Sequence, residues 1–276
     1  MIEARNRRGR GADMDRSDGH EETDGTVGEG AGSEQRRKAR LAAYDALRER
    51  HPDMFVNPPG GAIEILLNRA DQERVAKEVT ELAVTSGLPE ESGDIGVVYR
   101  DPYVCVLRDA VRFPSGRTGT YIRLVSAAEA AGAAVLPVLS DGRLILLRHF
   151  RHAERGWHWE IPRGFGSPGE DSASTARREL QEEVGCEASD LTHLGPMSPD
   201  TGLRAGRDQL YLAHVDAATF QDGANPGARE EGIEGCRALS VKEFEDMLLS
   251  GRISDAYTLA AYGLARARGL LAEASP

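Results

Sequence analysis

The fold is decided by the stretch GFGSPGEDSASTARRELQEEVGC, which runs from Gly164 to Cys186 of this 276-residue chain. At about 100° per residue, the spacing of its apolar side chains predicts a helix over about residues 171–185. The apolar stripe of this helix consists of Ala173, Ala176, Leu180 and Val184. Three glutamates fall on a neighbouring arc, at the edge of the buried face: Glu179, Glu182 and Glu183. Because like charges at this spacing repel, while Mg²⁺ takes oxygen ligands, the cluster indicates a divalent-cation site.

A second interpretation of the same stretch stays open. The glutamates could form an ordinary solvated helix face, in which Arg178 offsets Glu182 four residues later. Residues 167–170 have the form of a capping box, with Pro168 at the first helical position. The preceding glycines then form either a tight strand-to-helix turn alone, or a turn that also brings backbone carbonyls to a metal.

The spacing of the whole stretch resembles the Nudix box. That motif reads Gly, five residues, Glu, seven residues, then Arg-Glu-aliphatic-any-Glu-Glu-any-Gly-aliphatic. The matching residues are Gly164, Glu170, Arg178, Glu179, Leu180, Glu182, Glu183 and Gly185. Cys186 stands at the closing aliphatic position, where a buried thiol packs like a small apolar side chain. The resemblance implies an α+β Nudix hydrolase fold, an α/β/α sandwich around a mixed sheet, here with a helical N-terminal extension.

The resemblance also implies the activity and the roles of the box residues. Nudix hydrolases cleave the pyrophosphate bond of a nucleoside diphosphate linked to another moiety, with Mg²⁺ or Mn²⁺ as cofactor. Glu179, Glu182 and Glu183 are then the catalytic metal ligands, joined by the backbone carbonyl of Arg163. The residues expected to orient them from a second layer are Gly164, Glu170 and Arg178.

The flanks of the box resemble the ADP-ribose pyrophosphatase and nucleotide-sugar branch of the family. The similar stretches are LILLRHFRHAERGWHWEIPRG, MSPDTG, and EEGIEG followed by FEDMLLSGRISDAYTLAA. This implies that Arg151 binds a phosphate and that Trp159 and Glu160 lie near the base or ribose. Trp159 has an alternative place in the sheet core or at a dimer contact. Arg163 departs from the small residue usual before the box glycine, and we expect it to add a positive charge near the phosphates.

A general base must reach the attacking water. In this branch a glutamate after the Ser-Pro-Gly stretch often serves, and SPDTGLRAGRD contains none. The candidate bases are Glu230, Glu231, Asp200 and Asp208. Three histidines near the box are expected to be mainly structural: His149, His152 and His158.

The substrate implied by the branch is ADP-ribose or a similar nucleotide sugar. ADP-ribose would give AMP and ribose 5-phosphate. The alternatives are another Nudix substrate, such as NADH, a dinucleotide or a GDP-sugar, and a non-catalytic regulatory module that only binds a nucleotide ligand. Such modules commonly lose box glutamates, and this chain keeps them, which favours catalysis.

The composition argues against nucleic acid and membrane as main partners, and the cysteine content indicates a reducing compartment. A formal net charge of -11 disfavours nucleic acid or an anionic membrane as the main partner. No apolar run reaches the roughly 18 residues of a membrane span. The three cysteines are widely spaced, so we expect free thiols in a reducing cytoplasm. The branch usually forms homodimers, which we expect here.

Hydrophobic patterning divides the chain into three parts. Residues 1–40 contain no aromatic residue or leucine, and they are predicted to be a disordered tail. Residues 41–92 are predicted to be a helical extension of unassigned role, and residues 93–272 the Nudix domain. The helices are expected near 41–50, 71–86, 171–185, 241–251 and 255–269. The strands are expected near 97–112, 120–127, 132–151 as a hairpin, 157–164, 191–198, 208–215 and 234–239.

Overall fold

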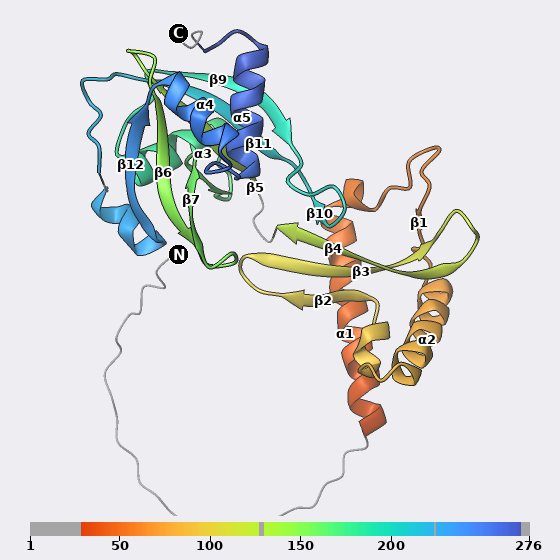
Figure 1. Cartoon of the computed structure of the whole chain (residues 1–276). Coiled ribbons are helices and arrows are strands. Elements are labelled where there is room, and N and C mark those ends of the chain that lie inside the picture. Colours follow the sequence, from red (N-terminus) through yellow and green to blue (C-terminus); the bar gives the residue numbers. More distant parts are fainter. Residues whose placement is uncertain (1–28, 127–129, 224, 272–276) are drawn as a thin grey trace, which may run out of the picture.

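The computed structural model describes residues 29–126, 130–223 and 225–271. Within these residues the strands form a sheet of seven strands and a sheet of five. Figure 1 shows the larger sheet in the C-terminal part of the chain and the smaller one beside the N-terminal helices. None of the helices in the described ranges is long and apolar enough to cross a bilayer.

The larger sheet is mixed. Its main path runs β12-β6-β5-β11-β9, with β7 paired to β6 and β8 to β5. β11 pairs with β5 in parallel and with β9 in antiparallel. The strands are β5 (Ala130–Leu139), β6 (Leu144–Arg151), β7 (Gly156–Glu160), β8 (Arg163–Gly166), β9 (Asp190–Met197), β11 (Asp208–Val215) and β12 (Ile233–Leu239).

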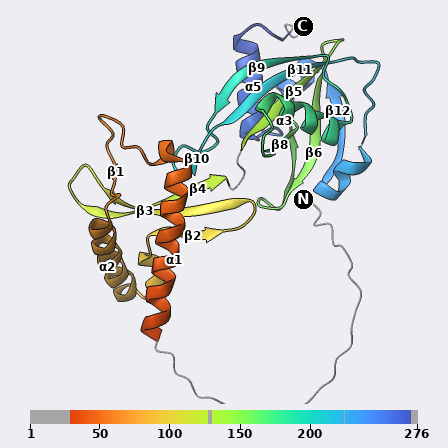
Figure 2. The ribbon, with the colours of Figure 1, turned by 180° about the vertical axis from the view of Figure 1, so that it is seen from behind.

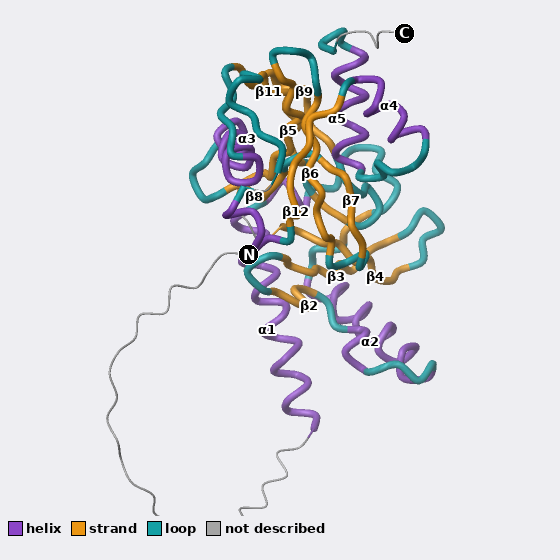
Figure 3. Tube along the Cα trace, turned by 60° about the vertical axis from the view of Figure 1, so that its left-hand side comes forward, coloured by secondary structure: helices purple, strands orange, loops and turns teal. Residues whose placement is uncertain are grey.

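Helices cover both faces of this sheet. Figure 3 shows α3 (Ser172–Glu179) on one side of the strands, with α4 (Val241–Leu249) and α5 (Ala256–Ala267) on the other. Side chains alternate between the faces of a strand. Val135 and Ile145 therefore pack in the core beneath α3, while Leu136 and Leu146 pack in the core beneath α4 and α5. The predicted α/β/α sandwich with a mixed sheet is confirmed.

The smaller sheet and two helices form what we call the N-terminal unit, residues 29–126. Its strands are β1 (Glu64–Ile65), β2 (Gly96–Arg100), β3 (Val104–Arg112) and β4 (Thr118–Ser126), and β10 (Arg204–Ala205) joins them from later in the chain. α1 (Glu29–Arg50) packs through Tyr44 against Leu107, and α2 (Arg69–Thr85) packs through Val75 against Ala110. Short 3-10 turns follow α1 and precede β2, at Pro52–Phe55 and Glu90–Gly93. Figure 2 shows α1 running past β2, β3 and β4.

Two expectations about the start of the chain change. The predicted tail of residues 1–40 is wrong over 29–40, because α1 begins at Glu29; residues 1–28 lie outside the described residues. This part of α1 is fixed by charge, since Arg36, Arg37 and Arg40 all bind the fully buried Asp94. The domain boundary expected between residues 92 and 93 does not divide the structure, because helices before it and strands after it share a hydrophobic core. The predicted extension is therefore part of a unit that contains both helices and strands.

Candidate active site

The turn from β8 into the helix depends on Gly164. A Cβ atom at this position would lie 2.0 Å from Oε1 of Glu179, so any other residue would displace that carboxylate. The neighbouring Arg163 backbone N–H donates to Oε2 of Glu183 at 3.0 Å. β8 therefore lies directly over two of the predicted metal ligands.

The helix of the box consists of α3 and a following π-helical turn, Leu180–Val184, and we call residues 172–184 the box helix. Its N-cap is Asp171, whose side chain accepts from the N–H of Ser174 at 2.7 Å. The capping box predicted at residues 167–170 lies before the helix. There, Oε2 of Glu170 accepts from the N–H of Ser167 at 3.1 Å, which closes a turn instead.

Arg178 contacts several residues of the box at once. Its Nη1 donates to Glu179 at 2.8 Å and to Glu182 at 2.9 Å, and its Nη2 donates to the carbonyl of Phe165 at 2.9 Å. Its Nε lies 3.3 Å from Glu170, and this pairing with Arg178 lowers the pKa of Glu170. Contacts with three carboxylates and with β8 are those of a residue that orients the others.

The three glutamates do not share one environment. Glu179 and Glu183 are 6% and 3% exposed, whereas the side chain of Glu182 is 54% exposed. Burial raises the pKa of Glu179, and it raises the pKa of Glu183 well above its ordinary value. The charge of Glu179 is the second cause at Glu183. Two buried carboxylates thus interact electrostatically, and the third is largely exposed.

This donor set fits a hard divalent cation. In the ranges the structure describes, no group of three His, Cys, Asp or Glu residues is already gathered for a metal. Arg178 holds Glu179 and Glu182 in ion pairs. The raised pKa values mean that ionising both buried carboxylates is unfavourable without a counter-charge, which a bound cation would supply. Glu179 and Glu183 would hold the cation, with Glu182 approaching from the rim.

A basic cluster adjoins the carboxylates. Oε1 of Glu160 lies 2.6 Å from Nη2 of Arg151 and 2.8 Å from Nδ1 of His149. Nη2 of Arg163 is 3.7 Å from Oε2 of the same carboxylate. Burial acts to raise the pKa of Glu160, and these basic neighbours outweigh it, so the pKa is lowered. Arg151 also acts electrostatically on Glu183, which places its positive charge beside the box.

Two residues predicted to contact the substrate, Glu160 and Trp159, make contacts within the protein. Glu160 is 1% exposed and enclosed by basic side chains, so it holds Arg151 in place and offers no surface to a substrate. Trp159 packs against the core beneath α4 and α5, which is the alternative place considered for it. The Arg163 side chain turns toward α5, where it lies 4.4 Å from the ring centre of Tyr257 and 3.6 Å from Asp255. Its guanidinium is thus held by α5.

The candidate bases separate into engaged and available groups. The Asp200 side chain accepts from the N–H groups of its own turn. Asp208 is buried, accepts two bonds from Arg204, and lies 2.5 Å from the Tyr257 hydroxyl. Glu230 and Glu231 are exposed in the 3-10 turn Pro226–Glu231. Of these, Glu231 raises the pKa of both Glu179 and Glu183, so its carboxylate lies near them.

His149, which the sequence placed near the box and assigned a mainly structural role, contacts two parts of the site. Its Nε2 donates to the carbonyl of Glu231 at 3.0 Å, while its Nδ1 faces Glu160. The ring therefore connects the basic cluster to the turn that carries Glu231. The sequence gives no signal that would link a histidine of this strand to Glu231, which lies 82 residues later.

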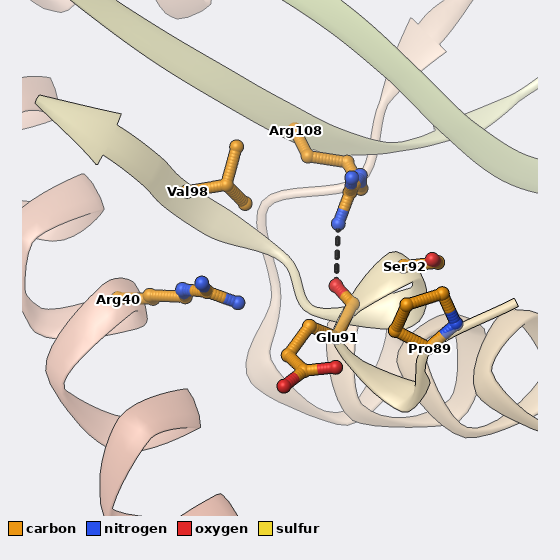
Figure 4. A pocket seen from close by; sticks show the side chains of 6 residues that line it. All are labelled: Arg40, Pro89, Glu91, Ser92, Val98 and Arg108. Carbon is orange, nitrogen blue, oxygen red and sulfur yellow. Dashed lines mark hydrogen bonds between the residues drawn. The ribbon is translucent and has the colours of Figure 1, made fainter.

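A shallow pocket of about 420 Å³ lies apart from the box, in the N-terminal unit (Figure 4). Arg108 and Arg40 both line it. Arg108 donates to the carbonyls of Glu91 and Asp94 at 2.8 and 3.0 Å, and Arg40 binds the Asp94 carboxylate. Both guanidinium groups are therefore engaged, and no box residue lines this pocket.

Comparison with known proteins agrees with the box. The NUDIX domain model matches residues 129–262. A CMP-5'-(N-acetyl-N-hydroxy-3-aminopropyl)phosphonate hydrolase of Streptomyces rubellomurinus is 33% identical over 178 residues, which cover 62% of this chain and 82% of the relative. An ADP-ribose pyrophosphatase of Mycobacterium tuberculosis is 35% identical over 108 residues, 38% of this chain and 50% of the relative. The ADP compounds hydrolase NudE of Escherichia coli is 33% identical over 79 residues, 29% of this chain and 42% of the relative.

A solved structure has the same fold. The crystal structure of an ADP compounds hydrolase aligns with a TM-score of 0.50 and 24% identity, over 63% of this chain and 91% of that chain. At this identity the likeness concerns the fold alone. Taken with the box geometry and the sequence matches, it leads to one conclusion: the chain belongs to the NUDIX family and is a hydrolase that resembles the ADP-ribose pyrophosphatase branch.

Proposed function

We propose that this chain hydrolyses the pyrophosphate bond of ADP-ribose or a similar nucleotide sugar, with Mg²⁺ or Mn²⁺ as cofactor. The observation that carries the proposal is the buried pair Glu179 and Glu183, held beneath β8 with Arg151 beside it. The relatives named ADP-ribose pyrophosphatase and ADP compounds hydrolase support the substrate class.

The residues divide the work of hydrolysis among them. A bound divalent cation would supply the positive charge that lets an anionic diphosphate approach the carboxylates, and would acidify a water molecule. Arg151, fixed by Glu160, neutralises a phosphate oxygen with its forked donors. Arg178 keeps the box carboxylates in register with β8. Glu231 accepts the proton of the attacking water, because it is the exposed carboxylate that acts on both buried glutamates.

A second substrate class is favoured by one observation. The relative that shares 82% of its length with this chain is named as a hydrolase of a CMP-linked phosphonate. A CMP-linked phosphonate is anionic like a nucleotide sugar, so the same carboxylates and Arg151 would serve it.

Incubation of the purified chain with Mg²⁺ and a set of compounds tests both classes. The set contains ADP-ribose, a GDP-sugar, NADH, a dinucleotide and a CMP-linked alkylphosphonate, and products are followed by chromatography and ³¹P NMR. We expect AMP and ribose 5-phosphate from ADP-ribose. Tight binding of a compound with no turnover of any would instead indicate a regulatory module.

The remaining parts of the proposal concern assembly and location. We propose a homodimer, as is usual in this branch, and light scattering on the purified chain measures it. We also propose a reducing cytoplasmic location, which the three free, buried cysteines support. Residues 93–272 would form the catalytic part, with the first strands of that range built into the N-terminal unit.

A further inference from the structure

The box helix ends with carbonyl groups that accept hydrogen bonds from outside the helix, although the Gln181 carbonyl also accepts from the N–H of Gly185 at 3.0 Å. The last carbonyls of any helix lack the N–H groups that a next turn would supply. Here the chain leaves the π-helical turn at Gly185, whose φ of 83° is left-handed. Nδ2 of Asn225 donates to the carbonyl of Gln181 at 3.1 Å and to that of Glu182 at 2.6 Å. One amide from 40 residues later thus closes the end of the helix that carries the metal ligands.

The same asparagine begins the turn that carries Glu231. It is the N-cap of the 3-10 turn Pro226–Glu231, and its carbonyl accepts from the N–H of Ala228 at 3.0 Å. Ala228 is 2% exposed and packs in the core beneath α3. At the far end His149 holds the carbonyl of Glu231, and the N–H of Phe150 donates to the carbonyl of Gly232 at 2.9 Å. The turn is therefore attached to the box helix at its start and to β6 at its end.

These attachments act against a repulsion. The Glu231 carboxylate acts electrostatically on both Glu179 and Glu183. Like charges favour separation, and the exposed Glu231 side chain is free to move toward solvent. A turn fixed at one end only would let the carboxylate move away from the box.

We propose that Asn225 is a positioning residue, which holds the turn 226–231 against the box helix so that Glu231 stays beside the two buried glutamates. The inference rests on the proposed function, in which Glu231 accepts a proton from water. A displacement of about 1 Å at a reacting group costs up to roughly 100-fold in rate, so loss of the clamp is expected to affect turnover.

The test compares Asn225→Ala and the isosteric Asn225→Asp, which has no N–H to donate, with Asn57→Ala. Asn57 is a matched control in the N-terminal unit, because its side chain also makes two bonds to backbone, both with Ile65. We expect both Asn225 variants to lower kcat by about 10- to 100-fold with little change in KM. We expect Asn57→Ala to keep the parent's kcat. Mn²⁺ titration without substrate, followed by electron paramagnetic resonance, should give the parent's Kd in all three.

A double variant separates positioning from general damage. If Asn225 acts through Glu231, the pair Asn225→Ala with Glu231→Gln should be no slower than Glu231→Gln alone. Multiplied losses would overturn the proposal, as would a weakened Mn²⁺ Kd in the Asn225 variants, because a merely structural cap would produce either result. Full activity in Glu231→Gln would also overturn it, while leaving the hydrolase assignment intact.

If the proposed function is wrong, the result is different: the parent chain hydrolyses none of the compounds. Hydrogen exchange then tests the clamp directly. Faster exchange over residues 226–232 in Asn225→Ala, and parent-like exchange there in Asn57→Ala, would support it. Parent-like exchange in both variants would refute it.

Discussion

Replacing Glu183 by glutamine should remove the hydrolase activity and at the same time make the metal-free protein more stable. Glu183 is 3% exposed, faces the negative charge of Glu179, and accepts one hydrogen bond from the backbone of Arg163. Glutamine keeps the shape and can still accept that bond, so the substitution removes mainly the charge. The metal-free variant then no longer buries a second ionisable carboxyl group beside Glu179.

The expected gain follows from the cost of burying an uncompensated polar group, about 1–3 kcal/mol. For a chain of this size that corresponds to a rise in Tm of roughly 2–10 °C. Calorimetry in EDTA measures it, and Glu182→Gln serves as the control for stability. Because the Glu182 side chain is 54% exposed and paired with Arg178, its replacement should change stability by no more than about 1 kcal/mol. Loss of a metal ligand should lower kcat by roughly 100-fold or more.

The pH dependence has a definite sign. The pKa of Glu183 is raised in the folded protein, so over a range of pH the fold holds a proton that the unfolded chain has released. Stability that depends on this proton is lost as the pH rises through that range. The Tm of the metal-free parent should therefore fall more steeply with rising pH than that of Glu183→Gln. A variant that unfolds at or below the parent's Tm in EDTA would refute the reasoning.

Three further predictions concern other parts of the chain. Arg163→Ala should lower kcat in steady-state kinetics and change KM by no more than about twofold, because α5 holds the guanidinium. A large rise in KM would indicate that the side chain contacts the phosphates. Asp94→Asn should lower the free energy of unfolding, measured by urea titration, by about 2 kcal/mol or more. This loss is smaller than that for a fully enclosed ion pair, because the arginines are partly exposed. An unchanged urea midpoint would contradict the prediction. Burial raises the pKa of Cys236 to about 11, so mass spectrometry should find it unmodified by iodoacetamide at about pH 8 in the folded protein and alkylated in denaturant.

The parts of the site that follow one helix or one strand were predictable from the sequence. The register of the box places Glu179 and Glu183 by local geometry, and the structure keeps them together on the buried side. The helical spacing of about 100° per residue also grouped Glu182 with them. The structure separates it, because its carboxylate turns outward to Arg178. Hydrophobic alternation likewise located the strands, since it depends only on neighbouring residues.

Contacts between distant segments were not predictable in this way. The contact of His149 with Glu231 joins residues 82 positions apart, and Asn225 reaches Gln181 across 44. No spacing rule connects such residues. The alternation of β3 and β4 also does not say which sheet they enter. The first turns of α1 were missed for another reason, because ion pairs with Asp94 hold them instead of an apolar stripe.

The two-residue strand β10 has a consequence for how this protein can vary in evolution. Arg204 pairs with β4 of the N-terminal unit through its backbone, and its side chain binds the hydroxyl of Tyr257. The ring of Tyr257 lies against Arg163, whose N–H holds Glu183. A short series of contacts thus leads from the N-terminal unit to the carboxylate of Glu183. If recombination replaced the N-terminal unit by an unrelated one, the new unit would need a strand edge that can pair with β10 as β4 does. The N-terminal unit and the Nudix part of the chain are therefore expected to be inherited together.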